Sequence, residues 1–362
     1  MKEYSQSKAL YHIDKIRDLQ QGNPIAPTEI QVDLEAYCND NCNFCSYRKE
    51  DGVNNTMLSL LDGKTHKENK PIGKPTKSSG WDSTMAVSLP KQMLEAGIPA
   101  IEITGGGEST LWPHFDELLT NLGEAQRDIA LVTNGSNLSD RRIDLICKYC
   151  LWVRISMDAS NGVLHKQIHR TANYDFDRRV SNIKKIIHLK PKELILGISF
   201  IINHENYDDI EESALFYHGL GVDNIRFSWM YDSSGTSGLS IEQIAQAKKL
   251  LDKLQDKLGI IHYDTDRTEL YTAPNDDFDT CHFQRFVWSI GADMKVYPCC
   301  IMKYNPNFAY GDLRENTLKE LIDKMHESQT GLVPAKCMPC WLRNKNKAIG
   351  NAVEQPLHHN FI

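Results

Sequence analysis

Short runs of apolar and β-branched residues alternate along the chain with longer stretches in which apolar residues recur at helical spacing. The short runs predict six strands, at residues 29–34, 100–104, 129–133, 152–157, 194–202 and 224–229. Helical spacing recurs between and after them, most clearly over 176–187 and 241–258. Such alternation is typical of repeated βα units around a parallel sheet. It predicts an α/β fold, an open, TIM-like partial (β/α)6 barrel whose active site lies at the C-terminal ends of the strands.

Two intervals depart from this alternation. Residues 49–80 are rich in Lys, Asn, Gly, Ser and Pro, and we interpret them as an insertion, either a solvated loop or a lid over the active site. Beyond residue 258 the pattern changes to a turn-rich segment, a hairpin over 286–297 and a short helix over 317–325. We therefore expect four parts: an N-terminal helical extension over 1–27, the barrel over 28–260, a small cysteine-rich module over 261–345 and a C-terminal tail over 346–362.

The composition argues against several classes of protein. The chain has 362 residues, with 41 Lys+Arg against 48 Asp+Glu and a formal net charge of −7. An acidic chain lacks the basic footprint of a general nucleic-acid binder, so nucleic acid is not an expected partner. No apolar run approaches the roughly 20 residues that span a bilayer, and residues 1–20 lack the apolar core of a signal peptide. We expect a cytoplasmic protein with no membrane partner, and disulfides are rare in the cytoplasm.

The ten cysteines therefore need another explanation, and they fall into three groups. Cys38, Cys42 and Cys45 follow the first predicted strand directly. Three thiolates on a short loop can ligate three irons of a [4Fe–4S] cluster and leave the fourth iron without a protein ligand. An open position of this kind is a feature of catalytic metal centres. A structural zinc ion is a weaker match because it takes four ligands and no fourth Cys or His lies nearby.

The other two groups have different expected roles. Four cysteines near the C-terminus would form a closed site that suits either a [4Fe–4S] cluster or zinc, and these are Cys281, Cys299, Cys337 and Cys340. Cys300 is a spare that would replace Cys299 as a ligand in an alternative arrangement. Cys147 and Cys150 are interpreted as buried thiols on a helix that packs against the sheet, with a redox pair as the alternative.

The segment Cys38-Asn-Asp-Asn-Cys42-Asn-Phe-Cys45 resembles the CxxxCxΦC hallmark of the radical S-adenosylmethionine (SAM) superfamily, with Phe44 at the aromatic position. After the second strand, residues 104–108 read TGGGE and are similar to the family's GGE motif, which receives the amino group of the SAM methionine. Glycines suit that role because the backbone must approach the ligand closely. The resemblance implies that Gly106, Gly107 and Glu108 bind SAM, with Glu108 accepting a charge-assisted hydrogen bond from an ammonium group.

Further motifs of the same family follow the later strands. Asn134 lies in a TNG sequence similar to the family's strand-end motif. Ser156 and Asp158 lie in an R-I-S-x-D sequence that looks like the segment whose polar groups reach SAM. The resemblance implies that these three residues contribute to the SAM site. Arg170 lies where relatives often carry an arginine that pairs with the SAM carboxylate, one residue farther from His165 than in the common pattern.

The C-terminal cysteines lie in a region that resembles the auxiliary-cluster regions of SPASM and twitch proteins, in which a hairpin precedes a CxxC pair. The resemblance implies that one auxiliary [4Fe–4S] cluster is held by Cys281, Cys299, Cys337 and Cys340. The twitch-type pattern with a single cluster fits because no cysteine follows Cys340. Cys299 is preferred to Cys300 because it preserves the family's Pro-Cys match.

The resemblance implies an enzyme, a radical SAM oxidoreductase or an epimerase- or transferase-like enzyme. It would cleave SAM reductively to a 5′-deoxyadenosyl radical that abstracts a hydrogen atom from its substrate, with flavodoxin or ferredoxin as electron donor. The short segment before the first strand favours a small polyol, sugar or nucleotide that is oxidised or epimerised. The alternatives are a SPASM-like maturase that modifies a peptide or protein side chain and a non-catalytic zinc- or Fe–S-binding scaffold. No residue is nominated as catalytic acid, base or hydrogen donor.

Overall fold

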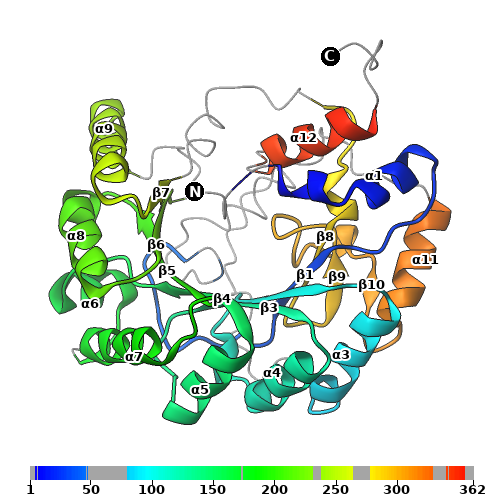
Figure 1. The fold of residues 1–362 in the computed structure, drawn as a ribbon, viewed down its shortest axis with the longest axis horizontal. Helices are drawn as coiled ribbons and strands as arrows, with labels where there is room; N and C mark the ends of the chain where they lie inside the picture. The colour runs from blue at the N-terminus through cyan, green and yellow to red at the C-terminus, as the bar shows by residue number, and fades with distance from the viewer. Residues whose placement is uncertain are drawn as a thin grey trace.

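The structure is a computed structural model, and it describes residues 5, 7–45, 47, 80–172, 174–230, 238–263, 278–328, 340 and 342–354. Most of the expected insertion at 49–80 lies outside these residues, as do the expected ligand Cys337 and residues 355–362. The described residues form one curved sheet with helices packed on its outer face (Figure 1).

Seven parallel strands, β1 to β7, follow one another across the sheet in chain order. Strand β8 pairs in parallel with the other edge of β1, and β9 and β10 extend the sheet with antiparallel pairing. The sheet order is therefore β10-β9-β8-β1-β2-β3-β4-β5-β6-β7. The strands span Glu29–Asp33 (β1), Ala100–Thr104 (β2), Asp128–Thr133 (β3), Cys150–Ser156 (β4), Ile195–Ile202 (β5), Asn224–Trp229 (β6), Ile261–Tyr263 (β7), Val287–Ile290 (β8), Lys295–Tyr297 (β9) and Gly311–Asp312 (β10).

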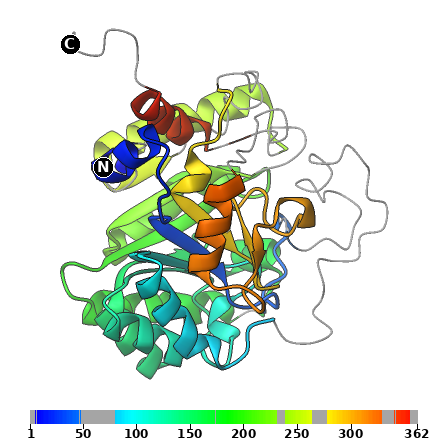
Figure 2. The ribbon, with the colours of Figure 1, turned by 90° about the vertical axis from the view of Figure 1, so that its right-hand side faces the viewer.

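Helices α3 to α9 follow the parallel strands and cover the outer side of the sheet (Figure 1). Helices α1 and α12 lie beside each other at one end of the barrel, as Figure 2 also shows. None of the helices in the described part of the chain has both the length and the apolar character that crossing a bilayer requires. The helices span Ile13–Gln20 (α1), Met85–Glu95 (α3), Phe115–Glu124 (α4), Asp140–Tyr149 (α5), Gly162–His169 (α6), Asp175–Leu189 (α7), Ile210–Leu220 (α8), Ile241–Leu258 (α9), Leu318–Ser328 (α11) and Arg343–Val353 (α12).

The alternation of side chains along the strands explains this layered arrangement. In β2, Ile101 and Ile103 are buried in the main apolar core, whereas Glu102 and Thr104 line an internal cavity. Successive residues of a strand point to opposite faces of the sheet. One face of the sheet therefore builds the apolar core under the helices, and the other supplies polar groups to the inside of the barrel.

The expected α/β fold with six parallel strands and a C-terminal hairpin is confirmed, and the structure adds four features. Strand β7 is a seventh parallel strand, and β8 joins the hairpin directly to the barrel sheet. Residues 346–353, which we expected in a C-terminal tail, continue helix α12, which packs against α1. Cys150 begins β4 instead of ending a helix, because α5 stops at Tyr149, although both Cys147 and Cys150 are buried as expected.

Candidate active site

A cavity of about 880 Å³ lies along the inner face of the parallel strands. Residues from four strand ends meet there, and those expected from the sequence are Cys38, Cys42, Phe44, Cys45, Gly106, Gly107, Glu108, Asn134, Ser156 and Asp158. The structure thus brings together every residue expected around the first cluster and SAM except Arg170. Arg170 is exposed, ends α6 and is not among the residues that line the cavity.

The loop that carries the three cysteines (residues 34–45, the cysteine loop) packs against the glycine-rich loop after β2. The backbone N–H groups of Gly107 and Glu108 donate to the carbonyls of Glu35 and Tyr37 at 3.0 and 2.9 Å. A Cβ atom at position 107 would lie 2.3 Å from the Tyr37 oxygen, closer than nonbonded atoms approach. Glycine at this position therefore allows the two loops to contact each other backbone to backbone.

The other side of the cysteine loop rests on the C-terminal end of α6. The N–H groups of Asn41 and Asn43 donate to the carbonyls of His169 and Ile168 at 3.0 and 2.9 Å. The last four carbonyls of a helix have no partner within the helix, so the loop satisfies two of them. The cysteine loop is thereby fixed between the end of β2 and the end of α6.

Hydrogen-bond donors approach the sulfur atoms of Cys38 and Cys42. The backbone N–H of Asp40 donates to Cys38 Sγ at 3.4 Å, and Asn134 Nδ2 lies 3.9 Å from the same atom. A ring nitrogen of His169 lies 3.2 Å from Cys42 Sγ. Burial, with a smaller effect of the Asp40 charge, raises the pKa of Cys38 above its usual value, whereas a thiol bound to a metal is deprotonated. Three cysteines on one loop, with donors directed at their sulfurs, fit the ligands of a [4Fe–4S] cluster.

Glu108 joins the ends of β2 and β3. Its Oε1 accepts hydrogen bonds from Thr110 N at 3.1 Å, Thr110 Oγ1 at 2.6 Å and Thr133 Oγ1 at 2.7 Å. Its Oε2 accepts from the backbone N–H of Asn134 at 2.7 Å. A carboxylate has about four acceptor positions, two on each oxygen. Oε2 therefore keeps a position for one further donor at the cavity that Glu108 lines.

Asn134 links the end of β3 to the cysteine loop. Its Nδ2 donates to Asn39 Oδ1 at 2.8 Å, and its Oδ1 accepts from the N–H and the hydroxyl of Ser136 at 2.9 and 2.7 Å. Asn39 Nδ2 in turn donates to Ser136 Oγ at 2.7 Å. These bonds give Asn134 a part in positioning the cysteine loop, alongside the SAM contact that the family resemblance implies.

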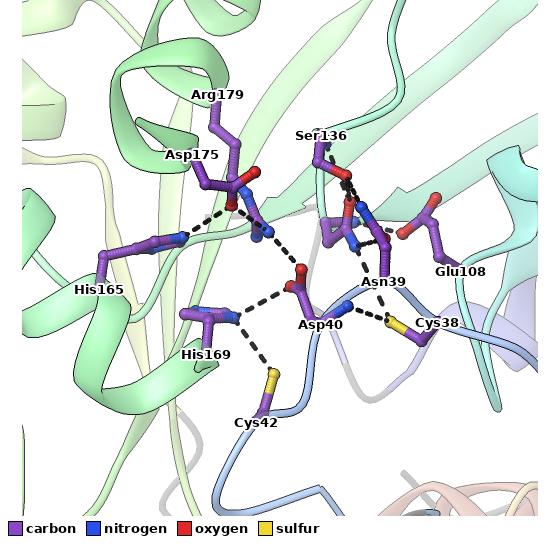
Figure 3. Close-up of polar contacts among 12 residues, drawn as sticks. Cys38, Asn39, Asp40, Cys42, Glu108, Ser136, His165, His169, Asp175 and Arg179 are labelled. Carbon is purple, nitrogen blue, oxygen red and sulfur yellow. Dashed lines mark hydrogen bonds and ion pairs between the residues drawn. The ribbon is translucent and has the colours of Figure 1, made fainter. Parts of the chain in front are cut away.

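A buried group of charged side chains extends from the cysteine loop to α6 and α7 (Figure 3). Arg179 is fully buried, and its Nη2 lies 2.5 Å from Asp40 Oδ1 and 2.6 Å from Asp175 Oδ2. His169 Nδ1 lies 3.2 Å from Asp40 Oδ2, and His165 Nε2 lies 3.3 Å from Asp175 Oδ2. The two imidazole rings stack with their centroids 4.2 Å apart. We call these five residues the charged network.

The charged network shifts the pKa values of its members. Burial alone would lower the pKa of His169, but the Cys42 sulfur and the Asp158 and Asp40 carboxylates raise it well above its usual value. Burial alone would raise the pKa of Asp40, but the hydrogen bond from His169 and the charge of Arg179 lower it. Because each charge has an opposite partner, the network keeps ions in a place where a lone charge would be strongly disfavoured.

Two of the expected SAM contacts have surroundings that the sequence did not reveal. Asp158 has a left-handed backbone, with φ of 55°, and its Oδ1 accepts from the N–H of Ile201 at 2.5 Å. Its Oδ2 lies 3.1 Å from His169 Nε2 but has no hydrogen-bond partner among the described residues. Arg170 also has a left-handed backbone and does not line the cavity, whereas the preceding residue, His169, does.

The second cysteine site lies in a small apolar core of its own. Cys299 is buried there with Met302 and Ile349, and Cys281 and Cys340 pack against the same core. Burial raises the pKa of Cys299 well above its usual value, and the neighbouring cysteines add to this shift. Three of the four expected ligands thus gather at one place, while the fourth lies outside the described residues.

Cys300, the expected spare, has a different position from its neighbour Cys299, because it also lines the central cavity. Lys303 lines the same wall, and its Nζ lies 2.6 Å from Asp33 Oδ2 with both side chains buried. The hydroxyl of Tyr304 donates to the same Asp33 oxygen at 2.7 Å. Because Asp33 ends β1 and Lys303 follows β9, this ion pair joins the C-terminal module to the barrel.

Sequence reasoning missed the charged network and the Asp33–Lys303 pair. One signal was available for the network, since His165 and His169 are four residues apart and therefore share one face of a helix. Asp40, between two cysteines of one loop, was a second signal. No local pattern links Asp33 to Lys303, since they are far apart in the sequence and meet only through the pairing of β1 with β8.

Comparison with known protein families agrees with this geometry. The model of the radical SAM superfamily matches residues 36–217, which is half of the chain. The model of SPASM, an iron–sulfur cluster-binding domain, matches residues 281–341. The zinc site and the non-catalytic scaffold, which the sequence left open as alternatives, receive no support from these matches.

The individual relatives have low sequence identity to this chain. The S-adenosylmethionine-dependent nucleotide dehydratase of Flammeovirga pacifica is 30% identical over 152 residues, which cover 42% of this chain and 45% of that protein. The sporulation killing factor maturation protein SkfB of Bacillus subtilis (strain 168) is 24% identical over 283 residues, which cover 75% of this chain and 60% of SkfB. The chain thus spans roughly half the length of the curated relatives that it matches.

Among solved structures, Streptococcus suis SuiB bound to the precursor peptide SuiA has a TM-score of 0.61 and 14% sequence identity. The match covers 87% of this chain and 69% of SuiB, and it shows a shared fold. Together with the family matches, it accounts for both the barrel and the C-terminal module. The chain belongs to the radical SAM superfamily, and it is an enzyme whose cofactors are SAM, a [4Fe–4S] cluster and the auxiliary iron–sulfur of its SPASM domain.

Proposed function

We propose that Cys38, Cys42 and Cys45 bind the [4Fe–4S] cluster that acts on SAM, and that the central cavity holds SAM beside the substrate. The observation that carries this proposal is the common cavity of about 880 Å³, which all three cysteines and the SAM-motif residues of β2, β3 and β4 line. When bound, the cluster supplies the electron that cleaves SAM into methionine and a 5′-deoxyadenosyl radical.

The chain's own residues would bind and orient SAM for this step. Gly106 and Gly107 let the backbone come close to the methionine end, and Glu108 Oε2 offers its remaining acceptor position to the methionine ammonium. Phe44 and Ser156 line the same cavity from the cysteine loop and from β4. The role of these residues is orientation, since the bond cleavage itself belongs to the cofactor.

The C-terminal module would hold one auxiliary [4Fe–4S] cluster. Its proposed ligands share a thiol side chain and flank or follow the hairpin of β8 and β9, and they are Cys281, Cys299, Cys337 and Cys340. When bound, such a cluster would supply an acceptor for an electron from a substrate radical, which would make the net reaction an oxidation. Epimerisation, in which a hydrogen atom returns to the substrate, starts from the same abstraction.

For the substrate, we propose a peptide or protein side chain. The supporting observation is that the similarity to SkfB, a maturation protein by name, extends over 75% of this chain. The fold is also shared with SuiB, whose structure contains a precursor peptide. A small polyol, sugar or nucleotide is the second candidate, favoured by the similarity of 152 residues to a nucleotide dehydratase.

Anaerobic reconstitution tests the first part of the proposal. The chain with both clusters should hold about eight irons, and it should release 5′-deoxyadenosine from SAM when dithionite replaces flavodoxin or ferredoxin as the reductant. We expect Cys42→Ala to abolish this release. Cys147→Ala, which changes a buried thiol on α5 away from the cavity, is the matched control and should retain it. Undiminished release by Cys42→Ala would refute the assignment.

Deuterium transfer distinguishes the two substrate classes. Cells are grown on deuterated medium, and their extract is divided by size into a peptide and protein fraction and a small-molecule fraction. We expect the fraction that contains the substrate to place deuterium in the 5′-deoxyadenosine, and we expect this to be the peptide fraction. Deuterium from the small-molecule fraction alone would replace the peptide assignment by the second candidate.

A further inference from the structure

His169 has an unusual position for a histidine, because it lies directly against one of the expected cluster ligands. Its Nδ1 is 3.2 Å from Cys42 Sγ, and its side chain is only 1% exposed (Figure 3). Phe44 presents its ring to His169 at a centroid distance of 6.3 Å and an interplanar angle of 77°. The ring of His169 is thus enclosed on the side of the cysteine loop.

Both ring nitrogens of His169 face hydrogen-bond acceptors. Around Nδ1 these are Cys42 Sγ and Asp40 Oδ2, each at 3.2 Å. Around Nε2 the acceptor is the Met157 carbonyl at 3.1 Å, and Asp158 Oδ2 lies at the same distance without hydrogen-bond geometry. A nitrogen without a hydrogen would face these acceptors with its lone pair, which is repulsive. These surroundings suit a tautomer with an N–H on Nδ1, the nitrogen that faces Cys42 Sγ.

Contacts with Asp40 and His165 fix the orientation of the His169 ring. Asp40, which contacts Nδ1, is held in place by the buried Nη2 of Arg179 at 2.5 Å. His165 stacks on the other face of the ring, with centroids 4.2 Å apart, and is itself held by Asp175. Within the charged network, His169 is the residue whose side chain lies at hydrogen-bond distance from Cys42 Sγ.

We propose that His169 is a positioning residue that donates an N–H to Cys42 Sγ and raises the reduction potential of the cluster bound at this loop. Reduction adds one electron to the cluster and its sulfurs. A hydrogen bond to a ligand sulfur and a nearby positive charge stabilise that added charge, and both are recognised determinants of cluster potential. The inference rests on the proposed ligation by Cys42.

A higher reduction potential would make the first step of the reaction, reduction of the cluster, more favourable. A higher reduction potential would allow the bound cluster to be reduced by a weaker electron donor, and the buried charge of Arg179 is kept away from solvent that would screen it. Asp40 and Asp158 limit the increase in reduction potential, since their negative charges lie close to the His169 ring. The hydrogen bond to sulfur is therefore the larger part of the expected effect.

The test is an EPR-monitored redox titration of the reconstituted full chain. The relevant signal is identified as the one that SAM perturbs and that Cys42→Ala lacks. His169→Phe keeps a ring but removes both donors, and at a given solution potential we expect its ratio of reduced to oxidised cluster to fall about tenfold, or 59 mV for one electron. His169→Asn retains one neutral donor near the Nδ1 position and should show a smaller fall.

His165→Phe is the matched control, because it makes the same substitution at a histidine that does not donate to the sulfur and keeps a ring stacked on His169, and its ratio should stay within about threefold of the parent. Equal potentials for the parent and His169→Phe, at equal iron content, would overturn the inference. Loss of iron in both His169 variants but not in the control would also overturn it, in favour of a role only in holding the loop. An unchanged SAM-sensitive signal in Cys42→Ala would instead refute the proposed ligation.

Discussion

The two cysteine sites differ in the side chains that approach their sulfurs. Near Cys38 and Cys42 these side chains are polar or charged, with Asn134 and His169 closest. Cys299 is instead packed in an apolar core, and backbone N–H groups are the donors directed at it and at Cys281. The comparison teaches that cysteine spacing alone does not separate the two roles. Charged surroundings accompany the site that opens onto the cavity, and apolar packing accompanies the closed one.

The largest expected effect comes from removing the cation at the centre of the charged network. Arg179→Met leaves Asp40 and Asp175 buried without their partner, and we expect the free energy of unfolding to fall by about 3–5 kcal/mol. Urea unfolding of the full-length, cluster-free chain measures this change. Arg178→Met is the matched control, since Arg178 pairs with Asp175 from a half-exposed position, and about 0–1 kcal/mol is expected. Similar losses in both variants would show that burial does not set the strength of this network.

A smaller effect should appear in the acid sensitivity of the same region. Burial alone would raise the pKa of Asp175, but the hydrogen bond from His165 and the charge of Arg179 lower it below its usual value. A carboxyl with a lowered folded pKa contributes stability that is present above its unfolded pKa of about 3.9 and is lost as the pH falls toward the folded value.

For one such carboxyl, the loss between pH 6 and pH 3 is about 1 kcal/mol. We expect urea unfolding to show a shallower decline for Asp175→Asn than for the parent over this range. Asp177→Asn, which changes an exposed carboxyl on the same helix, should leave the decline unchanged. A parallel decline in Asp175→Asn would contradict the assignment of acid sensitivity to the charged network.

The smallest effect is expected in the apolar core of the second site. Ile349→Val removes one methylene group beside Cys299, and a loss of about 0.5–1.5 kcal/mol is expected. Ile241→Val, at a position that is 79% exposed, should change the stability by less than about 0.5 kcal/mol. Neither variant should alter the potential of the SAM-sensitive cluster. A shift in that potential with Ile349→Val would show that the two sites are coupled, and the comparison would need revision.

Much of the fold could be predicted because its strands are long and strongly patterned. Strands β2 and β5, for example, are apolar runs bounded by turn residues, and their helices repeat apolar residues at helical spacing. Strand β7 was missed because three residues are too few to show alternation. The pairing of β8 with β1 could not be predicted, since it joins segments that no local pattern connects.

The parts of the candidate site that could be predicted are those whose residues lie close together in the sequence. The cysteine loop and the glycine-rich loop each carry their signal within a few residues. The surroundings of the sulfurs were not predictable, because a buried histidine such as His169 has the same local sequence whether it packs in a core or contacts Cys42. Arg170 shows the opposite error, a residue that the sequence assigned to the site and that does not line the cavity. Its position in the sequence suggested a SAM contact, yet α6 ends in a way that exposes it.

The central place of β1 in the sheet has a consequence for how the chain folds during synthesis. This strand is made early, but one of its two neighbours, β8, spans residues 287–290. The edge of β1 that β8 covers therefore stays unpaired until the ribosome has passed residue 290. Unpaired strand edges favour association with other chains, and long-range pairing is slow to form. A nascent or truncated chain that stops short of β8 would therefore expose the edge of β1, which would be prone to aggregation.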